Sequence, residues 1–355
     1  MKKILISTGG SGGHVVLALN LYHHLKENFD VNIYTDVRGA KYIPRNINKI
    51  IFEVKKIPDK NYLLPLKILF LFLAFIKALI NLSKNKFDIL VSTGGYMSLP
   101  LVLAAKLFKK KIFLFEPNSI IGQSNKFLLN FSNKIFCYDK KLKGINRKYL
   151  HKIIPIPPIL KKCFYTENIN NLKNDSLKIL IIGGSQASFF FSKNLKQEII
   201  KLASKYNIQV TQQLSDGFNI NDYKKDYTNN NIQNNLFFFE ENLLCNNPDF
   251  DIAISRSGAS SLAELSHLNI PFITIPFPHA TDNHQFLNAK RYHELNCCWI
   301  LEEKNFNSGD IYKIINQIMV NKSEYIKKKN NLNRLCKNNT WKIINEKLIK
   351  NLDDN

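Results

Sequence analysis

Four glycine-rich segments of this sequence have the residue types and spacing to bind a phosphate group or a sugar. Each follows a short apolar run, and they are residues 7–14 (STGGSGGH), 92–96 (STGGY), 183–186 (GGSQ) and 256–259 (RSGA). An apolar strand followed by glycines and the start of a helix directs backbone N–H groups toward an anion. One pair of segments lies in each half of the chain. This repetition predicts a ligand held between two halves of similar fold.

The first segment differs from two common nucleotide-binding motifs. It is not a Walker A loop, because no Gly-Lys-Ser/Thr follows the glycines. It matches the dinucleotide fingerprint only in part, because Val15 occupies the third glycine position. Asp36, at the end of the next predicted strand, could bind a ribose. A nicotinamide-dependent enzyme therefore stays open as an alternative.

His14 is the candidate catalytic residue of the first segment. Gly12 and Gly13 let a bulky ligand approach the backbone, and the imidazole follows them at a predicted helix start. A neutral imidazole in that place suits a general base. The alternative interpretation is a structural histidine at a helix N-terminus.

The second half carries two further candidate binding segments. In residues 256–264, a turn with small residues precedes Glu264, whose carboxylate could accept both hydroxyls of a ribose. The alternative is a surface Glu that is favoured near a helix N-terminus. In residues 276–285, His284 and Gln285 could bond sugar hydroxyls, since loops at the carboxyl ends of parallel strands carry ligands.

The composition indicates a globular chain of two domains with a large positive charge. It has 355 residues, a hydrophobic fraction of 45% and a net charge of +22. The charge reflects either a Lys/Asn-rich coding bias or attraction to anionic lipid or a phosphorylated substrate. No nucleic-acid-binding motif is recognisable, so we expect no nucleic-acid partner.

The cysteines and the N-terminus predict the compartment. The 6 cysteines form no C-x-x-C pair, and no metal-ligand spacing occurs, so we expect free thiols, no metal and no cofactor. The apolar stretch at residues 4–6 is too short for the core of a signal peptide. Both observations favour the cytoplasm.

Apolar runs alternate with helical patterns, which predicts an α/β fold with two doubly wound parallel sheets. Predicted strands are residues 3–7, 31–35, 88–92, 111–115, 177–182, 208–212, 237–239, 251–255 and 271–275. Predicted helices are residues 15–27 and 192–206, and the polar residues 219–235 are expected to form a surface loop. The proline-rich residues 151–158 predict a connection between domains 1–156 and 157–330, followed by a helical tail over 331–355.

The segment from Leu63 to Lys84 is apolar but interrupted by lysines. It is too short in uninterrupted apolar residues to span a membrane, which takes about 20 of them. Lys67, Lys77 and Lys84 fall on one side of a helical wheel, and the apolar arc is wider than packing on one sheet requires. The segment is predicted to be either a buried crossover helix or a helix that contacts a membrane surface.

In order and spacing, the motifs resemble those of the MurG family, N-acetylglucosaminyltransferases of glycosyltransferase family 28. The matching segments are GGSGGH at 9–14, GGYMSLP at 94–100, EPNSIIGQSNK at 116–126, GGSQ at 183–186, RSGASSLAE at 256–264 and PFPHATDNHQ at 276–285. The resemblance implies the GT-B fold, two Rossmann-like domains facing a cleft. It also implies inverting, metal-independent transfer of GlcNAc from UDP-GlcNAc to lipid I, which makes lipid II for peptidoglycan at the cytoplasmic face of the inner membrane.

The resemblance also implies roles for individual residues. His14 would be the base, and the acceptor pyrophosphate and donor sugar would lie against Ser11, Gly12 and Gly13. Contacts to the sugar nucleotide would come from Asn118, Ser185, Ala259, Ser260, Ser261, Glu264, His284 and Gln285. The segment from Leu63 to Lys84 would be the membrane-facing patch.

Some positions depart from the family pattern. Leu160 stands where the family has an Arg, and Glu240 stands where an apolar residue usually packs on the uracil. Losing that Arg removes a charged contact worth about 1–3 kcal/mol. A related enzyme with another lipid or glycan acceptor, and a non-catalytic protein that binds membrane surfaces, stay open as alternatives.

Overall fold

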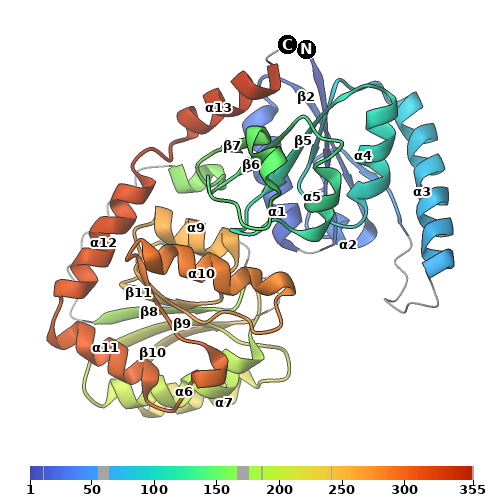
Figure 1. Cartoon of the computed structure of the whole chain (residues 1–355). Helices are drawn as coiled ribbons and strands as arrows, with labels where there is room; N and C mark the ends of the chain where they lie inside the picture. Colours follow the sequence, from blue (N-terminus) through green and yellow to red (C-terminus); the bar gives the residue numbers. More distant parts are fainter. Residues whose placement is uncertain (11, 55–63, 166–175, 185–186, 241, 354–355) are drawn as a thin grey trace. The chain divides into compact units, whose positions relative to one another are not determined.

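The structure is a computed structural model that describes all residues except 11, 55–63, 166–175, 185–186, 241 and 354–355 (Figure 1). The chain forms two compact units. The first contains Met1–Lys162 and Asn339–Asn355, and the second contains Cys163–Asn338. The last residues of the chain therefore belong to the first unit, and the proline-rich residues 151–158 lie within it.

The first unit is built on a parallel sheet with the strand order β3-β2-β1-β4-β5-β6-β7. Its strands are β1 (Lys3–Ser7), β2 (Asp30–Thr35), β3 (Lys49–Ile51), β4 (Ile89–Ser92), β5 (Lys111–Glu116), β6 (Lys134–Cys137) and β7 (Ile153–Pro155). Pro155 is tolerated because β7 is an edge strand and the next ladder bond, to the carbonyl oxygen of Cys137, is donated by Ile156 N at 2.9 Å.

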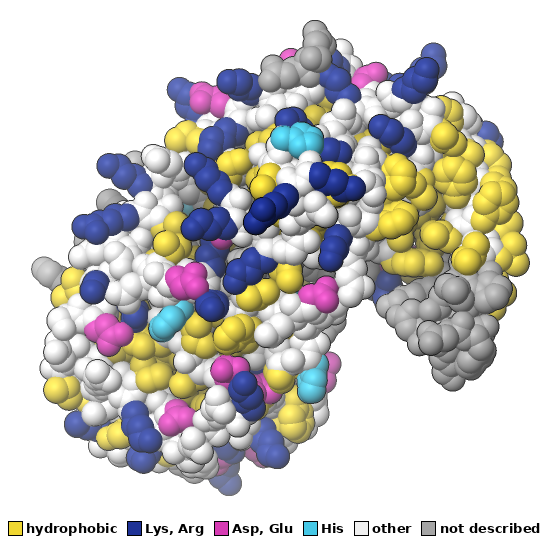
Figure 2. All heavy atoms as spheres, viewed as in Figure 1, with side chains coloured by type: hydrophobic (Ala, Val, Ile, Leu, Met, Phe, Trp, Pro, Cys, Tyr) yellow, Lys and Arg dark blue, Asp and Glu magenta, His cyan; other side chains and the backbone are white. Residues whose placement is uncertain are grey.

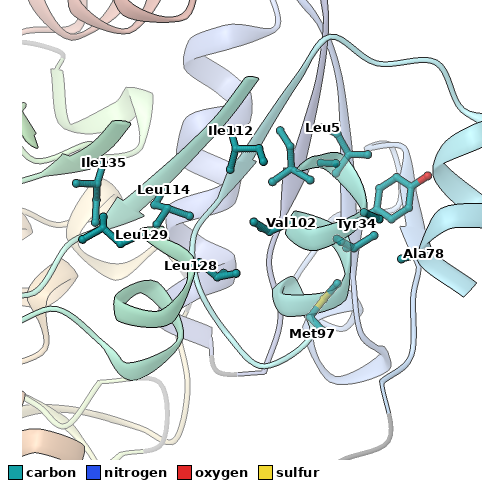
Figure 3. Packing of buried hydrophobic residues seen from close by; sticks show 14 of the residues in the cluster. Leu5, Tyr34, Ala78, Met97, Val102, Ile112, Leu114, Leu128, Leu129 and Ile135 are labelled. Atoms are coloured by element: carbon teal, nitrogen blue, oxygen red, sulfur yellow. The ribbon is translucent and has the colours of Figure 1, made fainter. Parts of the chain in front are cut away.

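Helices cover this sheet and bury its apolar side chains. They are α1 (Gly12–Leu25), α2 (Val37–Ala40), α3 (Leu64–Lys84), α4 (Ser98–Leu107), α5 (Gln123–Leu128), the short η2 (Arg147–Lys152) and α13 (Trp341–Asp353). Figure 3 shows the core between the sheet and α4, where Leu5, Val102, Ile112 and Leu114 pack together. Met97 belongs to this core and lies beneath Gly9, where a Cβ would come within 2.7 Å of its Cγ.

The second unit has a parallel sheet with the strand order β10-β9-β8-β11-β12-β13. Its strands are β8 (Leu177–Ile182), β9 (Ile208–Gln213), β10 (Gln233–Phe237), β11 (Ile252–Ser255), β12 (Phe272–Thr274) and β13 (Cys298–Ile300). Its helices are α6 (Phe189–Ala203), α7 (Ile220–Asn229), α8 (Leu243–Asn246), α9 (Ala259–His267), α10 (His284–Glu294), α11 (Asp310–Val320) and α12 (Ser323–Cys336), with short η3 (Lys162–Tyr165), η4 (Thr281–Asn283) and η5 (Glu303–Asn305).

Both sheets are doubly wound, which confirms the predicted fold class. The chain order reverses between β1 and β4 in the first sheet and between β8 and β11 in the second. Such a reversal point is where open α/β sheets bind ligands, outside the carboxyl ends of the strands. The four glycine-rich segments follow these four strands. The sequence pattern thus places all of them at the two reversal points.

Two predictions for the second unit are wrong. Residues 219–235 are not a loop, because α7 and most of β10 lie within them, and the strand expected at 237–239 ends at Phe237. The helix forms because Tyr223 and Tyr227, one turn apart, are both buried, and Asn219 accepts from the N–H of Asn221 at the helix start.

The cysteines also differ from the prediction of free thiols. Cys163 and Cys245 form a disulfide within the second unit. Cys137, Cys297 and Cys298 are buried and form no disulfide, as expected for structural thiols. Burial raises the pKa of Cys297 to about 11 and that of Cys298 to about 12, which keeps both thiols protonated and unreactive at neutral pH.

The helix α3 has one buried face and one exposed apolar face. Ala74, Ala78 and Leu82 are buried on the side that packs toward α4. On the other side, hydrophobic side chains stay exposed, and Figure 2 shows them gathered over α3: Leu66, Ile68, Leu69, Phe72, Leu73, Ile76 and Ile80. At about 100° per residue this exposed apolar arc covers roughly 160°. Over the part of the chain that is described, no helix is long and apolar enough to cross a membrane.

Candidate functional site

In the first unit, His14 is oriented by the backbone of the neighbouring loop. Its Nδ1 lies 2.7 Å from the carbonyl oxygen of Thr93, which follows β4. A carbonyl oxygen only accepts, so Nδ1 carries the hydrogen and donates it. In the neutral ring, Nε2 then keeps its lone pair and can take up a proton. The arrangement gives a half-buried imidazole the tautomer that a general base requires.

The two glycine loops of the first unit pack directly on each other. Thr93 Oγ1 lies 2.8 Å from Thr8 Oγ1 and 3.2 Å from the carbonyl oxygen of His14. Gly95 has a φ of +92°, and a Cβ there would lie 2.9 Å from the carbonyl oxygen of Gly9. Only glycine fits this left-handed conformation and this approach. Thr8, Gly9 and His14 thus lie directly against Thr93 and Gly95 of the segment after β4.

Glu116 organises the loop that contains Asn118. The carboxylate is 2% exposed and accepts from Asn118 Nδ2 at 2.9 Å, Gly122 N at 2.8 Å and Asn125 Nδ2 at 3.0 Å. A buried carboxylate is tolerated where several N–H groups bind it. A Cβ at Gly94 would lie 3.1 Å from His14 Cε1 and 3.8 Å from Asn125 Nδ2, so the Glu116 network reaches the catalytic candidate.

The carboxylate of Asp36 accepts hydrogen bonds from the backbone and is not free to bind a ribose. One carboxylate oxygen accepts from Gly39 N at 2.8 Å and Gly10 N at 3.2 Å, and the other pairs with Arg38 at 3.0 Å. Burial alone would raise the pKa of Asp36, but these N–H groups and Arg38 outweigh it and lower the pKa below its ordinary value. The carboxylate is a cap for α2 and a support for the first glycine loop, which argues against the nicotinamide alternative.

In the second unit, the start of α9 carries several predicted binding residues. Ala259, Ser260, Ser261 and Glu264 are half-buried on its first turns. Gly258 is the N-cap, and no side chain caps the helix there. The first N–H groups of α9 can therefore bind an anion, with the helix dipole adding to the attraction.

Gln285 joins two loops at this edge of the sheet. Its Oε1 accepts from Ser257 N at 3.2 Å and from Phe277 N at 3.0 Å. Because the carbonyl end is used by the backbone, the Nε2 end is the one that suits a sugar hydroxyl. His284 donates from Nδ1 to the carbonyl oxygen of Thr281 at 2.8 Å, which turns its Nε2 away from the backbone. Asp282 and Asn283, both with φ near +50°, form the left-handed turn that starts α10.

The chain is similar to known glycosyltransferases in both of its halves. Models of the glycosyltransferase family 28 N-terminal and C-terminal domains match residues 4–137 and 178–345. The chain is 42% identical over 355 residues to the UDP-N-acetylglucosamine–N-acetylmuramyl-(pentapeptide) pyrophosphoryl-undecaprenol N-acetylglucosamine transferase of Pelagibacter ubique, with 100% of this chain and 99% of that protein covered. This chain belongs to glycosyltransferase family 28. A Rickettsia canadensis protein of the same name is 34% identical over 88% of this chain and 89% of its own length.

Solved structures agree with this family 28 fold. The crystal structure of Acinetobacter baumannii MurG has a TM-score of 0.77 at 20% identity and covers 99% of this chain and 100% of that one. A UDP-GlcNAc 2-epimerase from Neisseria meningitidis, bound to UDP-GlcNAc, has a TM-score of 0.63 at 15% identity over 98% of this chain and 100% of that one. A transferase and an epimerase share the architecture, so the fold alone does not decide the reaction.

The predicted site residues of this family 28 chain fall into two groups, one in each unit. His14, Gly12, Gly13 and Asn118 lie at the carboxyl edge of the first sheet. Ala259, Ser260, Ser261, Glu264, His284 and Gln285 lie at the carboxyl edge of the second. Ser11 and Ser185 are outside the described residues.

The two positions that depart from the expected family pattern, Leu160 and Glu240, lie in different environments. Leu160 is 1% exposed, so the position is part of the core of the first unit. Glu240 is exposed beyond the end of β10, next to the exposed Phe239. Sequence reasoning missed Thr93, Glu116 and Asn125. Glu116 and Asn125 stand in a quoted motif, but the Thr93 contact uses a backbone carbonyl, which no residue type signals.

Proposed function

We propose that this protein transfers N-acetylglucosamine from UDP-GlcNAc to lipid I, forming lipid II with inversion at the anomeric carbon. The observation that carries the proposal is 42% identity, over the whole chain, to a relative named for this reaction. The orientation of His14 supports it, because the reaction needs a base for the acceptor hydroxyl and Nε2 is free of the Thr93 contact.

In the proposed reaction, His14 Nε2 takes the proton of the acceptor hydroxyl while that oxygen attacks the anomeric carbon of GlcNAc. A carbon–oxygen bond forms to the acceptor as the bond to the UDP phosphate breaks. The negative charge of the leaving UDP is stabilised by N–H groups at helix N-termini such as that of α9.

The proposed binding residues divide between the two units. In the first unit, the acceptor pyrophosphate and donor sugar take Ser11, Gly12 and Gly13, and the GlcNAc takes Asn118. The UDP portion and the GlcNAc hydroxyls take Ser185, Ala259, Ser260, Ser261, Glu264, His284 and Gln285. Asn118 is supported by its bond to the buried Glu116, and Gln285 by its fixed carbonyl end.

We further propose that α3 places the protein on the cytoplasmic face of the inner membrane as a peripheral protein. Its exposed apolar arc lies opposite the buried one, and the chain carries a net charge of +22 that anionic lipids attract. The exposed apolar arc of α3 would then contact the same membrane that holds the lipid-linked acceptor.

Transfer is tested with purified protein, radiolabelled UDP-GlcNAc and a lipid I analogue, with UDP-GalNAc as the comparator donor. We expect lipid II from UDP-GlcNAc and a much lower rate from UDP-GalNAc. Product with a different acceptor but none with the lipid I analogue would instead indicate a related transferase. Vesicle binding without any transfer would indicate a non-catalytic membrane protein.

Membrane contact is tested by binding to vesicles that contain anionic phospholipid. The double variant Phe72→Glu/Ile76→Glu should bind at least tenfold more weakly, because burying each such side chain is worth roughly 1.5–3 kcal/mol. Lys86→Glu, an exposed position just past the end of α3, makes the same change of two charge units and is the control, which should lose far less. Equal losses in both would show that charge alone drives binding and would reject α3 as the contact surface.

A further inference from the structure

Arg256 is a buried cation that contacts separate segments at the carboxyl edge of the second sheet. It is 8% exposed, and its Nη1 donates to the carbonyl oxygens of Ile275 at 3.0 Å and Pro276 at 3.3 Å, just beyond β12. Its Nη2 donates to Glu303 Oε1 on η5, which follows β13. The guanidinium carbon also lies 4.8 Å from the ring centroid of Phe191 in the first turn of α6.

These contacts connect the loops that carry the proposed donor site. Arg256 itself follows β11 and stands just before Gly258, the N-cap of α9. The segment it holds after β12 leads into Phe277, whose N–H donates to Gln285. One guanidinium thus links the start of α6, the start of α9, the loop before α10 and η5.

We propose that the Arg256–Glu303 pair is a positioning device for the sugar nucleotide. It holds the loops after β11 and β12 so that the first N–H groups of α9 and the Nε2 of Gln285 keep the geometry that a nucleotide diphosphate sugar requires. Arg256 supports the site rather than binding substrate, because both terminal nitrogens donate to groups of the protein and the side chain is buried. The inference rests on the proposed function and adds two residues to it.

The physical reason for the pair is the cost of a buried charge. A guanidinium removed from water needs both hydrogen bonds and an opposite charge. Glu303, whose side chain is 18% exposed, supplies the charge. Without it, the guanidinium gains by turning toward water, and the carbonyl groups of Ile275 and Pro276 lose their donor. The loop after β12 is then no longer fixed against the loop after β11.

The test compares Glu303→Gln with Glu302→Gln in the full chain. Gln keeps the size and one acceptor of Glu303 but removes the charge. Glu302 is adjacent and pairs at 3.2 Å with the exposed Lys304, so its variant makes the same change of net charge without touching Arg256. We expect Glu303→Gln to raise the Kd for UDP and the KM for UDP-GlcNAc about tenfold, which corresponds to about 1.4 kcal/mol. The KM for the lipid I analogue should stay within about twofold, and Glu302→Gln should resemble the wild type.

A general loss of folded protein would lower the active fraction and would change the measurements for UDP-GlcNAc and for the lipid I analogue alike. A change confined to UDP and UDP-GlcNAc therefore indicates a positioning role and not a loss of stability. The double variant Arg256→Gln/Glu303→Gln should be no worse than Arg256→Gln alone, since the two residues act as one unit. Additive losses would overturn the pairing.

Hydrogen exchange gives a readout that needs no catalysis. In Glu303→Gln, the amides of residues 257–262 and 277–285 should exchange faster, while those of the first unit keep their rates. If the wild type fails to transfer GlcNAc, the proposed function fails and exchange still decides whether the pair orders these loops. If the wild type transfers normally but Glu303→Gln leaves exchange and UDP affinity unchanged, or Glu302→Gln matches its effect, the inference is overturned.

Discussion

Protonation of His24 should destabilise the first unit, whose C-terminal helix packs against this side chain. His24 is 1% exposed near the end of α1, and its Nδ1 donates to Asn345 Oδ1 of α13 at 2.5 Å. Its ring stacks on Trp341 with centroids 3.6 Å apart and planes at 21°. Burial lowers the pKa of His24 to about 4. The hydrogen bond to Asn345 acts in the opposite direction and raises the pKa, whereas the charge of His23 lowers it by a smaller amount. At neutral pH the ring is therefore uncharged in the folded chain.

The magnitude follows from the two pKa values. The unfolded chain binds a proton at His24 below about 6.5, whereas the folded chain binds it only below about 4. Between these values the unfolded state holds more protons, so the free energy of unfolding falls as the pH is lowered. The full difference is about 3 kcal/mol, at 1.36 kcal/mol per pKa unit. Above pH 6.5 His24 contributes no pH dependence.

The assay is urea unfolding of the first unit, followed by Trp341 fluorescence in a Trp299→Phe background at pH values from 4 to 8. His24→Gln removes the titrating group in the same background. The free energy difference between the two proteins should be constant above pH 6.5 and should change by about 3 kcal/mol in favour of the variant as the pH approaches 4. Parallel curves across the whole range would refute the assignment of this pH dependence to His24.

Two further predictions concern the proposed reaction. His14→Ala should lower turnover about 10²–10⁴-fold with little change in the Kd for UDP, because only the base is removed, and near-normal turnover would reject His14 as the base. Gln285→Glu keeps an acceptor for Ser257 N and Phe277 N but has no N–H donor, so it should raise the KM for UDP-GlcNAc about tenfold with a nearly unchanged Tm, whereas Gln285→Ala should also lower the Tm. A wild-type KM in Gln285→Glu would show that Nε2 does not bind the sugar.

Much of the fold was predictable because its signals are local. The predicted bounds of β1 and β8 match the structure, since uninterrupted Ile and Leu runs end at glycines or small polar residues in both cases. The helix α7 was missed because only Tyr223 and Tyr227 mark its buried face, among Asn, Asp and Lys residues typical of loops. The disulfide joins cysteines 82 residues apart, and no local pattern connects them.

The residue types of the candidate site were predictable from the sequence, but the contacts that orient these residues were not. His14 and Gln285 stand in glycine-rich or polar segments after strands, where parallel sheets carry ligands. Their fixed orientations come from contacts between loops that are far apart in sequence. His14 depends on a carbonyl 79 residues away, and Arg256 depends on Glu303, 47 residues away. Such partners follow from strand order, which the sequence pattern indicates only in outline.

Each unit fixes its binding loops with a buried charge that does not itself face a ligand. In the first unit, Glu116 accepts hydrogen bonds from N–H groups of Gly122, Asn118 and Asn125. These bonds hold the loop after β5 around the carboxylate. In the second unit, Arg256 draws in the carbonyl groups after β12. The signs suit the proposed chemistry. In the proposed reaction, a buried cation that takes up backbone acceptors would leave the uncapped N–H groups of α9 for the anionic diphosphate. The carboxylate in the first unit would hold the amide of Asn118 for an uncharged sugar. Exchanging the sign of Arg256 or of Glu116 should therefore weaken binding by the loops that the residue holds.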